Sequence, residues 1–134
     1  MAGYSKTPLI RKLGLPDSGR AVFLDAPPGY PAAIGALPGG LRVGSRLRPE
    51  LDYIHVFVAS RARLRVLVPR AVRALSKQGA LWISWPKLAS GLATDLRESD
   101  VREAGLDSGL VDVKICAVDE VWSGLKFVYR LRDR

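Results

Sequence analysis

Two apolar segments with an amphipathic segment between them constrain the fold most. Leu51–Ala59 is long, β-branched and aromatic, and Ala80–Trp85 is a second run typical of a buried strand. Between them, Ser60 is a good helix N-cap. Apolar residues then recur at helical spacing, namely Leu64, Leu67, Val68, Ala71, Val72 and Leu75. Pro69 interrupts the backbone hydrogen bonds of this helix, so we expect a kink or a split there, with Gly79 as the C-terminal stop.

Shorter segments extend this alternation in both directions. The sequence predicts a short helix at Thr7–Leu13 that Gly14 ends, and strands at Arg20–Asp25 and Leu41–Leu47. After the strand Ala80–Trp85, either Thr94 or Asp95 can cap a helix that runs to about Ala104, with Gly105 as its end. Strands and helices therefore alternate through most of the chain.

The last third of the chain has the pattern of an antiparallel hairpin. Leu110–Val118 and Trp122–Leu131 both alternate between apolar and polar residues, which is typical of half-exposed strands. Asp119 and Glu120 form the break between them and are expected to be turn residues, because neighbouring residues of a strand point to opposite sides. The complete order predicts one α/β domain over residues 1–134, with three layers and a mostly parallel sheet that ends in an antiparallel C-terminal hairpin at one edge.

Composition narrows the class of protein. The chain is 48% hydrophobic and 25% charged, which is typical of a globular domain. No apolar run approaches the roughly 20 residues of a membrane span, and the N-terminus has no signal-peptide core, so we expect a cytoplasmic protein without a membrane partner. Cys116 is the only cysteine, which excludes an internal disulfide and a multi-cysteine metal site.

Positive charge is concentrated in the first two thirds of the chain. Residues 1–94 hold 14 Lys and Arg against 4 Asp and Glu, a net of +10, whereas residues 95–134 hold 7 against 9, a net of −2. The candidates for nucleic-acid binding lie within residues 42–73, namely Arg42, Arg46, Arg48, Arg61, Arg65, Arg70 and Arg73. Such a surface can attract nucleic acid, phosphorylated ligands or an acidic partner, and the plain alternative is a protein that uses arginine as its ordinary surface cation.

Polar residues after the predicted strands mark a candidate ligand site, because ligands of open α/β sheets bind at the carboxyl ends of the strands. The candidate ligand-binding residues are Trp85, Lys87, Ser90, Gly91, Thr94, Asp95, Trp122 and Lys126. Lys87 can bind an anion, which suggests a small anionic or nucleotide-like ligand. The alternative is that Thr94 and Asp95 only cap a helix and that the tryptophans are core residues. Asp25 and Ser60 follow two other strands and are the candidates for cofactor binding.

No catalytic residue can be assigned from the sequence, and no metal site is expected. His55 is the only histidine and lies in the middle of a strand, so packing in the core is favoured over metal binding or catalysis. Cys116 is also in mid-strand and has no histidine at a useful spacing.

Two resemblances follow from these segments. The order of elements over residues 20–132, with Lys77–Ile83 leading into a strand and a closing hairpin, resembles a compact class I S-adenosylmethionine-dependent methyltransferase. This resemblance implies a cofactor loop rich in glycine after the first strand and an acidic residue after the second that holds the ribose. Here Phe23–Tyr30 has one glycine and two prolines, and the charged residues of the second strand are Arg42 and Arg46, so S-adenosylmethionine is a possible cofactor whose usual motif is absent.

The second resemblance is to a bacterial family named domain of unknown function 3052, and it implies a Rossmann-like fold without an assigned activity. Five groups of residues carry it: Gly3-Tyr4-Ser5 with Thr7-Pro8-Leu9, Trp85-Pro86-Lys87, Ser90-Gly91 with Thr94-Asp95-Leu96, Gly109-Leu110-Val111-Asp112 with Lys114, and Asp119-Glu120 with Trp122-Ser123-Gly124-Leu125-Lys126.

Three functions remain open from the sequence. The favoured hypothesis is a non-catalytic or regulatory module that binds a small ligand. The alternatives are a methyltransferase-like enzyme with an atypical cofactor site and a basic protein that binds nucleic acid. Homo-oligomerisation through the C-terminal hairpin is a further expectation, because Leu125, Phe127 and Tyr129 can extend a sheet across two chains.

Overall fold

The computed structural model describes residues 8–30 and 34–134. Its helices are α1 (Leu9–Leu13), α2 (Arg61–Ala74) and α3 (Glu98–Asp107). Its strands are β1 (Ser18–Leu24), β2 (Gly40–Gly44), β3 (Leu51–Phe57), β4 (Leu75–Pro86), β5 (Leu110–Ala117) and β6 (Trp122–Tyr129). The motif residues Gly3, Tyr4, Ser5 and Thr7 lie outside the described residues. In the part that is described, no helix is long and apolar enough to cross a membrane.

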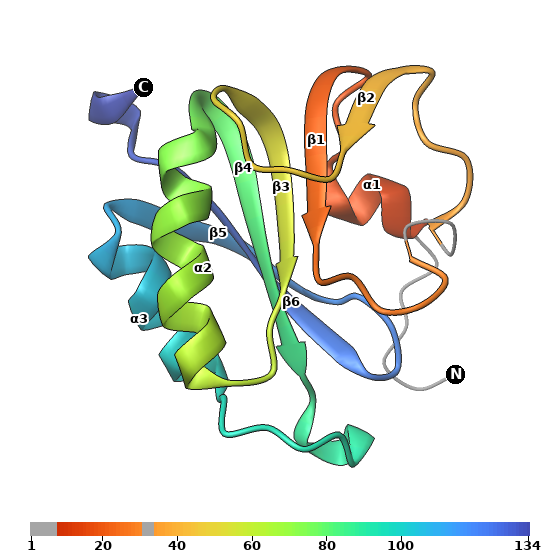
Figure 1. Cartoon of the computed structure of the whole chain (residues 1–134), viewed down its shortest axis with the longest axis vertical. Coiled ribbons are helices and arrows are strands. Elements are labelled where there is room, and N and C mark those ends of the chain that lie inside the picture. Colours follow the sequence, from red (N-terminus) through yellow and green to blue (C-terminus); the bar gives the residue numbers. More distant parts are fainter. Residues whose placement is uncertain (1–7, 31–33) are drawn as a thin grey trace.

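The six strands form one mixed sheet in the order β2-β1-β3-β4-β6-β5. The first four strands in this order are parallel, and β6 runs antiparallel to both β4 and β5 (Figure 1). The predicted fold class, a mostly parallel sheet with an antiparallel C-terminal hairpin at one edge, is therefore confirmed. The carboxyl ends of the parallel strands meet at the lower edge of the sheet in Figure 1, where the candidate ligand loops lie.

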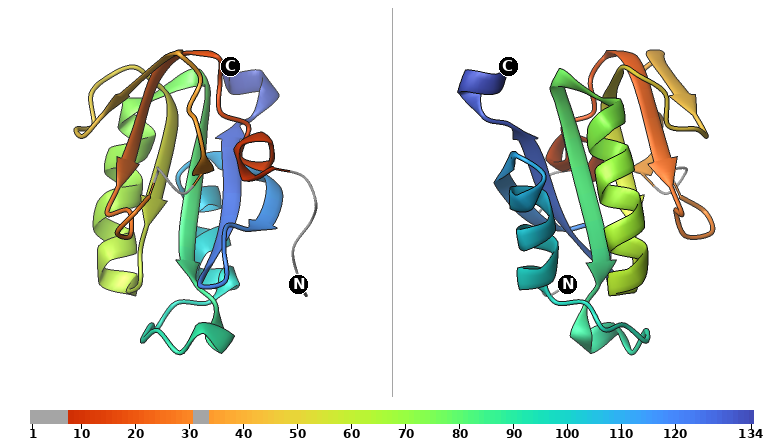
Figure 2. Two further views of the ribbon diagram at one scale, coloured as in Figure 1. Left: turned by 90° about the vertical axis from the view of Figure 1, so that its right-hand side faces the viewer. Right: turned by 60° about the vertical axis from the view of Figure 1, so that its left-hand side comes forward.

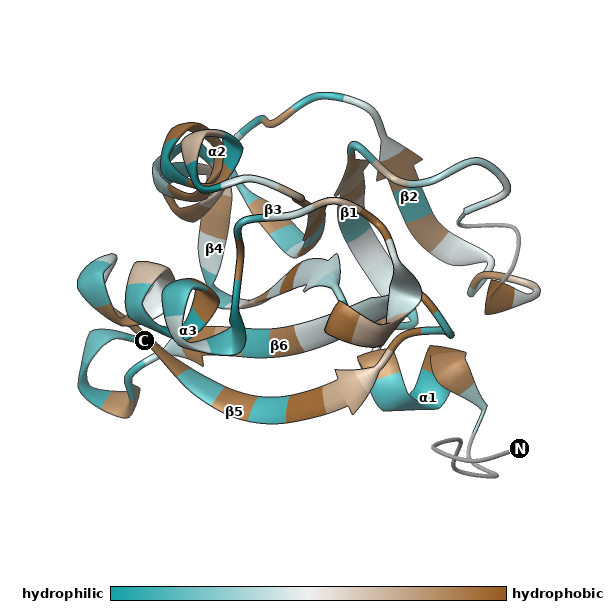
Figure 3. Cartoon of the chain, turned by 90° about the horizontal axis from the view of Figure 1, so that it is seen from below, coloured by the Kyte–Doolittle hydropathy of each residue, from teal (hydrophilic) through white to brown (hydrophobic). Residues whose placement is uncertain are grey.

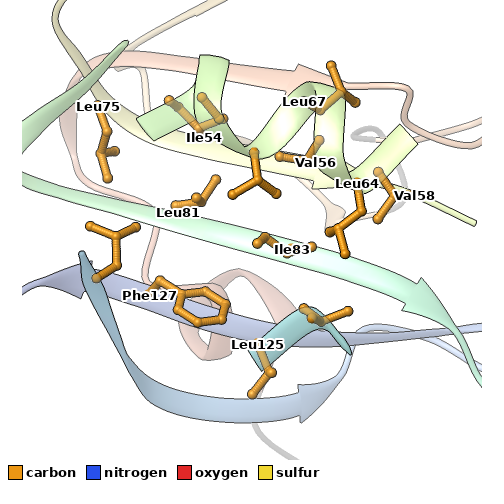
Figure 4. Close-up of a cluster of buried hydrophobic side chains, with 14 of the residues drawn as sticks. Ile54, Val56, Val58, Leu64, Leu67, Leu75, Leu81, Ile83, Leu125 and Phe127 are labelled. Carbon is orange, nitrogen blue, oxygen red and sulfur yellow. The ribbon is translucent and has the colours of Figure 1, made fainter. Parts of the chain in front are cut away.

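Helices α2 and α3 cover one face of the sheet, and α1 lies against the other (Figures 2 and 3). Under α2 and α3, apolar side chains of β3, β4 and β6 form the larger core, which includes Ile54, Ile83 and Phe127 (Figure 4). Full burial of each such side chain stabilises the fold by roughly 1.5–3 kcal/mol. On the opposite face, Trp82 packs with α1 and donates a 2.7 Å hydrogen bond from Nε1 to the carbonyl of Leu13.

The junction between α2 and β4 differs from the sequence expectation. Helix α2 is continuous through Pro69 and ends at Ala74, and β4 begins at the next residue, Leu75. Gly79 is not a helix stop, because it lies inside β4 where the register against β3 shifts. A Cβ atom at Gly79 would lie 2.9 Å from the carbonyl oxygen of Leu51, so the glycine allows two backbones to approach closely.

Helix α3 also differs from its prediction at both ends. It begins at Glu98 rather than after Thr94 or Asp95, and the Asp100 carboxylate closes its first turn by accepting a 2.9 Å hydrogen bond from the Arg97 N–H. Gly105 lies within the helix and does not end it. The close approach of the Phe127 ring explains why this helical position has no side chain.

The C-terminal hairpin forms as predicted, with Asp119 in its turn. The Asp119 carboxylate accepts hydrogen bonds from the N–H groups of Val121 (2.8 Å) and Trp122 (2.7 Å). Strand β6 is paired on both sides, so its backbone cannot extend the sheet to a second chain, and β5 is the strand at this edge. Val113 and Ile115 of β5 are 54% and 50% exposed, so an interface through this hairpin stays a prediction that would use β5.

We predict that Gly105→Ala lowers the free energy of unfolding by about 1–3 kcal/mol, because the added methyl group overpacks the contact with Phe127. In an exposed helix the same change stabilises by roughly 1 kcal/mol, so the sign of the effect is diagnostic. Urea unfolding measures it, with Ser99→Ala on the exposed surface of α3 as a control expected within about 0.5 kcal/mol of the parent. A Gly105→Ala protein as stable as the parent would contradict the packing described.

Candidate functional site

The chain changes direction across the sheet between β1 and β3. From β1 it passes to β2 on one side, and then crosses to β3 on the other side of β1. Loops that leave two neighbouring parallel strands in opposite directions open a crevice at their carboxyl ends, which is where open α/β sheets bind ligands. In this protein the rule places the expected crevice between Asp25, which follows β1, and residues 58–60, which follow β3; Figure 1 shows where these two strands end.

The two predicted cofactor residues, Asp25 and Ser60, both form a hydrogen bond with Arg63, one with its side chain and the other with its backbone. The Asp25 Oδ2 atom accepts a 3.0 Å hydrogen bond from Nε of Arg63. Ser60 caps α2 as predicted, with its Oγ 3.1 Å from the Arg63 N–H. Asp25 has a φ of 56°, in the left-handed region that few residues other than glycine adopt. Such strain is tolerated where the surroundings fix the residue, and it is concentrated at functional sites.

The loop after β4 is held by its own polar groups. Lys87 donates a 2.6 Å hydrogen bond from Nζ to the carbonyl of Asp119, and Ser90 donates one of 2.7 Å to the carbonyl of Lys87. Gly91 has a φ of 78° and ends the short 3₁₀ turn Leu88–Ser90. Trp85 is buried in the core beneath α2 and α3. These candidate residues therefore shape the loop, and a ligand contact by them stays a prediction.

Thr94 and Asp95 fasten the end of this loop to the start of α2. Thr94 donates a 2.6 Å hydrogen bond to the carbonyl of Ala59. The Asp95 carboxylate accepts a 2.8 Å hydrogen bond from the N–H of Arg61, the first residue of α2. The prediction that these residues cap the next helix, α3, is wrong: Asp95 satisfies an N–H of α2, which is far away in sequence but adjacent in the fold.

The two remaining candidates, Trp122 and Lys126, lie apart. Trp122 lies opposite Pro86 in the sheet and packs edge-to-face against Phe57, with ring centroids 5.3 Å apart, so it is close to the candidate loop. Lys126 lies farther along β6 and approaches Gly14 after α1. Partial burial, and then the charge of Lys114, lower the pKa of Lys126. The structure therefore does not bring Lys126 to the crevice.

A buried polar network behind the crevice was not predicted. The fully buried ring of His55 lies 2.7 Å from Ser84 Oγ through Nε2 and 3.5 Å from the Tyr30 hydroxyl through Nδ1. Desolvation lowers the pKa of His55 to about 3, and burial raises the pKa of Tyr30 well above its usual value. His55 also stacks on Phe57 at 4.3 Å. The expectation that this histidine is packed in the core is confirmed. The sequence held one sign of this network: Ser84 is the only polar residue in the predicted strand Ala80–Trp85.

Comparison with known structures supports the fold. The chain matches a fibrillarin pre-rRNA processing protein from Methanococcus jannaschii at 11% identity, with a TM-score of 0.55, over 93% of this chain and 70% of the other. It matches a ribosomal protein L11 methylase from Lactobacillus delbrueckii subsp. bulgaricus at 11% identity, with a TM-score of 0.56, over 91% and 75%. It also matches magnesium protoporphyrin IX methyltransferase from Synechocystis PCC 6803 with bound S-adenosylmethionine at 11% identity, with a TM-score of 0.61, over 91% and 74%.

At this level of identity the matches establish the architecture, which is Rossmann-like and shared with methyltransferases. No family model and no curated protein matches the sequence, so the resemblance to domain of unknown function 3052 has no support from these comparisons.

We predict that Asp95→Ala lowers the free energy of unfolding by about 1 kcal/mol, because it leaves an N–H at the start of α2 without its partner. Thermal or urea unfolding measures the loss. Asp107→Ala removes the same charge from the end of α3, where the described residues give it no hydrogen bond or ion pair, and serves as the control. Equal effects of the two substitutions would contradict the capping role of Asp95.

We predict a loss of stability in acid that depends on His55. The folded state keeps this ring neutral down to a pKa of about 3, whereas the unfolded chain protonates it near 6.5. Between these two pKa values the unfolded state therefore binds more protons than the folded state. The stability contributed by neutral His55 is fully present above pH 6.5, and below it the free energy of unfolding falls by up to about 1.4 kcal/mol per pH unit. Urea unfolding between pH 5 and 6.5 measures this slope, because carboxylates titrate mainly below that range.

The comparison protein is His55→Gln, which keeps a polar group near Ser84 and should have a flatter slope. An independent readout that needs no variant is the NMR signal of the imidazole, which should not titrate in the folded protein between pH 5 and 7.5. A histidine signal that titrates near pH 6.5 would contradict the burial of this ring.

Proposed function

We propose that this protein is a methyltransferase-like enzyme with an atypical cofactor site, and that it binds S-adenosylmethionine in the crevice between the carboxyl ends of β1 and β3. The observation that carries the proposal is the position of Asp25 and Ser60. Asp25 follows β1 and Ser60 follows β3, the two strands between which the strand order reverses, in a fold shared with methyltransferases. Similarity of fold alone does not transfer an activity, so the proposal depends on what these side chains can do.

Asp25 has the chemistry that a ribose requires. A carboxylate accepts hydrogen bonds through two oxygens, and only Oδ2 is engaged by Arg63 among the described residues. The side chain is 44% exposed, so Oδ1 is available to the two ribose hydroxyls. In the methyltransferase fold an acidic residue after the second strand does this work. We propose that Asp25, after the neighbouring first strand, replaces it here.

Other groups at this position would have to replace the glycine-rich loop, whose sequence motif is absent. Pro27 and Pro28 have no N–H to offer, so the loop after β1 cannot supply the backbone donors of a glycine-rich loop. The Ser60 hydroxyl, after the neighbouring strand β3, is the polar group that we propose takes their place, whereas Arg63 only positions the Asp25 carboxylate. We therefore expect recognition by side chains, and weaker binding than a preformed backbone cradle gives.

The substrate that would receive the methyl group is left open by the comparisons. The matched proteins are named for acting on a ribosomal protein and on magnesium protoporphyrin, and one is named for pre-rRNA processing. The matched proteins share a fold, but their names do not point to a common substrate. A protein that binds the cofactor and transfers no methyl group would instead be a binding module built on this fold.

Isothermal titration calorimetry with S-adenosylmethionine and S-adenosylhomocysteine tests the proposal. We predict binding by the parent protein and at least a tenfold loss of affinity in Asp25→Asn, because the amide NH₂ can no longer accept a hydrogen bond from the ribose. Arg63→Gln breaks the same ion pair but keeps the carboxylate, and should retain binding. Asp107→Asn is the control for a distant change of charge.

Two outcomes would contradict the proposal. One is no heat of binding for either ligand at millimolar concentration. The other is an equal loss of affinity in Asp25→Asn and Arg63→Gln, which would mean that the ion pair matters only for the local structure.

A further inference from the structure

Two recesses on the helix-bearing face of the sheet are lined by arginines and share one wall. The first has a volume of about 490 Å³ and lies over β1 and β2, and the second has a volume of about 510 Å³ and lies beside α2. Residues 45–49 contribute to both, and Arg46 lines both recesses. Figure 1 shows this segment crossing the sheet between the end of β2 and the start of β3. We call the two recesses together the arginine groove.

Seven arginines line the arginine groove. They are Arg20, Arg42, Arg46 and Arg48 in the first recess, and Arg63, Arg70 and Arg73, together with Arg46, in the second. All seven are exposed, and no acidic residue is among the lining residues that the structure describes. Arg63 has Asp25 as its partner, and the other six have no ion pair within residues 8–30 and 34–134. So much positive charge on a concave surface is unfavourable unless an anion joins it.

The arrangement selects the kind of anion. Seven guanidinium groups spread over two adjacent recesses exceed what one phosphate or one nucleotide can contact, and they suit a chain of phosphates. Arginine is also the side chain whose fork binds phosphate through two hydrogen bonds. The charges line recesses rather than a protruding helix or ribbon, so they do not fit the grooves of a duplex. A positively charged groove that follows the backbone is how single strands are held.

We propose that the arginine groove binds the sugar–phosphate backbone of single-stranded nucleic acid. The groove has no aromatic residue among its described lining residues, so bases have no ring to stack on. Binding is therefore independent of base sequence and depends on phosphate contacts alone. The proposal does not rest on the S-adenosylmethionine site, because it needs neither Asp25 nor Ser60. Its test changes Arg42, Arg46 and Arg70, and leaves Arg63, the partner of Asp25, intact.

Five of these arginines are among the candidates predicted from the sequence, and the fold changes the set. The five that were named and line the groove are Arg42, Arg46, Arg48, Arg70 and Arg73. Arg61 and Arg65 were also named, but they line a separate recess between α2 and α3 together with Asp100, Glu103 and Asp107. Arg20, which the linear pattern did not include, lies opposite Arg42 on the neighbouring strand.

Fluorescence anisotropy with a labelled 20-nucleotide single-stranded RNA of mixed sequence tests the proposal. The parent protein should bind at 50 mM salt, and the slope of log affinity against log salt should be about −3.5 to −5 for roughly five to seven phosphate contacts. The groove variant Arg42→Gln with Arg46→Gln and Arg70→Gln should bind about tenfold or more weakly at 0.1 M salt, with a slope smaller in magnitude by about 2. Exposed arginines tolerate these changes, and unchanged thermal unfolding will verify that the variant is folded.

The matched control is Arg11→Gln with Arg97→Gln and Arg132→Gln, which removes three positive charges from exposed positions outside the groove. It should change the affinity less than threefold. Equal weakening by the control and groove variants would overturn the proposal in favour of general attraction by net charge.

Competition assays separate the source of the phosphate groups. Duplex DNA, inorganic polyphosphate and ATP are added against the labelled strand, and unlabelled single-stranded RNA should displace it best. Displacement by ATP at lower concentration than by RNA would overturn the proposal in favour of a small-anion site, and tighter binding of the duplex would overturn the single-strand assignment. No binding at 50 mM salt would overturn it altogether. The Asp25→Asn variant, which loses the proposed cofactor contact, should bind the RNA as the parent does, so failure of one proposal does not imply failure of the other.

Discussion

The start of α2 is the point on which the arrangement of the carboxyl edge depends. The first N–H groups of a helix have no partner within the helix, and here two of them donate hydrogen bonds to side chains outside it. Ser60 supplies one partner from within the loop, and Asp95 supplies another from the segment after β4. Arg63, in the first turn of the helix, then holds Asp25 at the end of β1. Three loops that the sequence separates by tens of residues are thereby fixed in one place.

This constraint also explains which parts of the fold the sequence could predict. The strands, the cap at Ser60 and the C-terminal hairpin follow from local patterns of period and capping, and all three are confirmed. The start of α3 could not be predicted, because Thr94 and Asp95 look like local caps and are used by α2 instead. The role of Gly79 was hidden for a similar reason, since the close approach of β3 is a property of the sheet and not of the segment.

The candidate site was predicted in part. Its position at the carboxyl edge followed from strand order, and Asp25 and Ser60 were named there as candidates; each contacts Arg63 in the structure. In the loop after β4, Lys87 and Ser90 proved to donate hydrogen bonds to the backbone carbonyls of Asp119 and Lys87, and a linear sequence does not reveal such partners. Lys126 was placed with them only because the hairpin returns to that edge, and its position farther along β6 takes it to the other end of the sheet. The buried pair His55 and Ser84 needed the register of β3 and β4, which the sequence does not specify.

The central claim is that the crevice between β1 and β3 is the ligand site of a fold shared with methyltransferases. The most direct measurement is a two-dimensional ¹H–¹⁵N NMR titration of the labelled protein with S-adenosylhomocysteine. The account predicts chemical-shift changes confined mainly to residues 25–30 and 58–64, which border the crevice. Changes centred on residues 87–91 instead, or no changes at millimolar ligand, would contradict it.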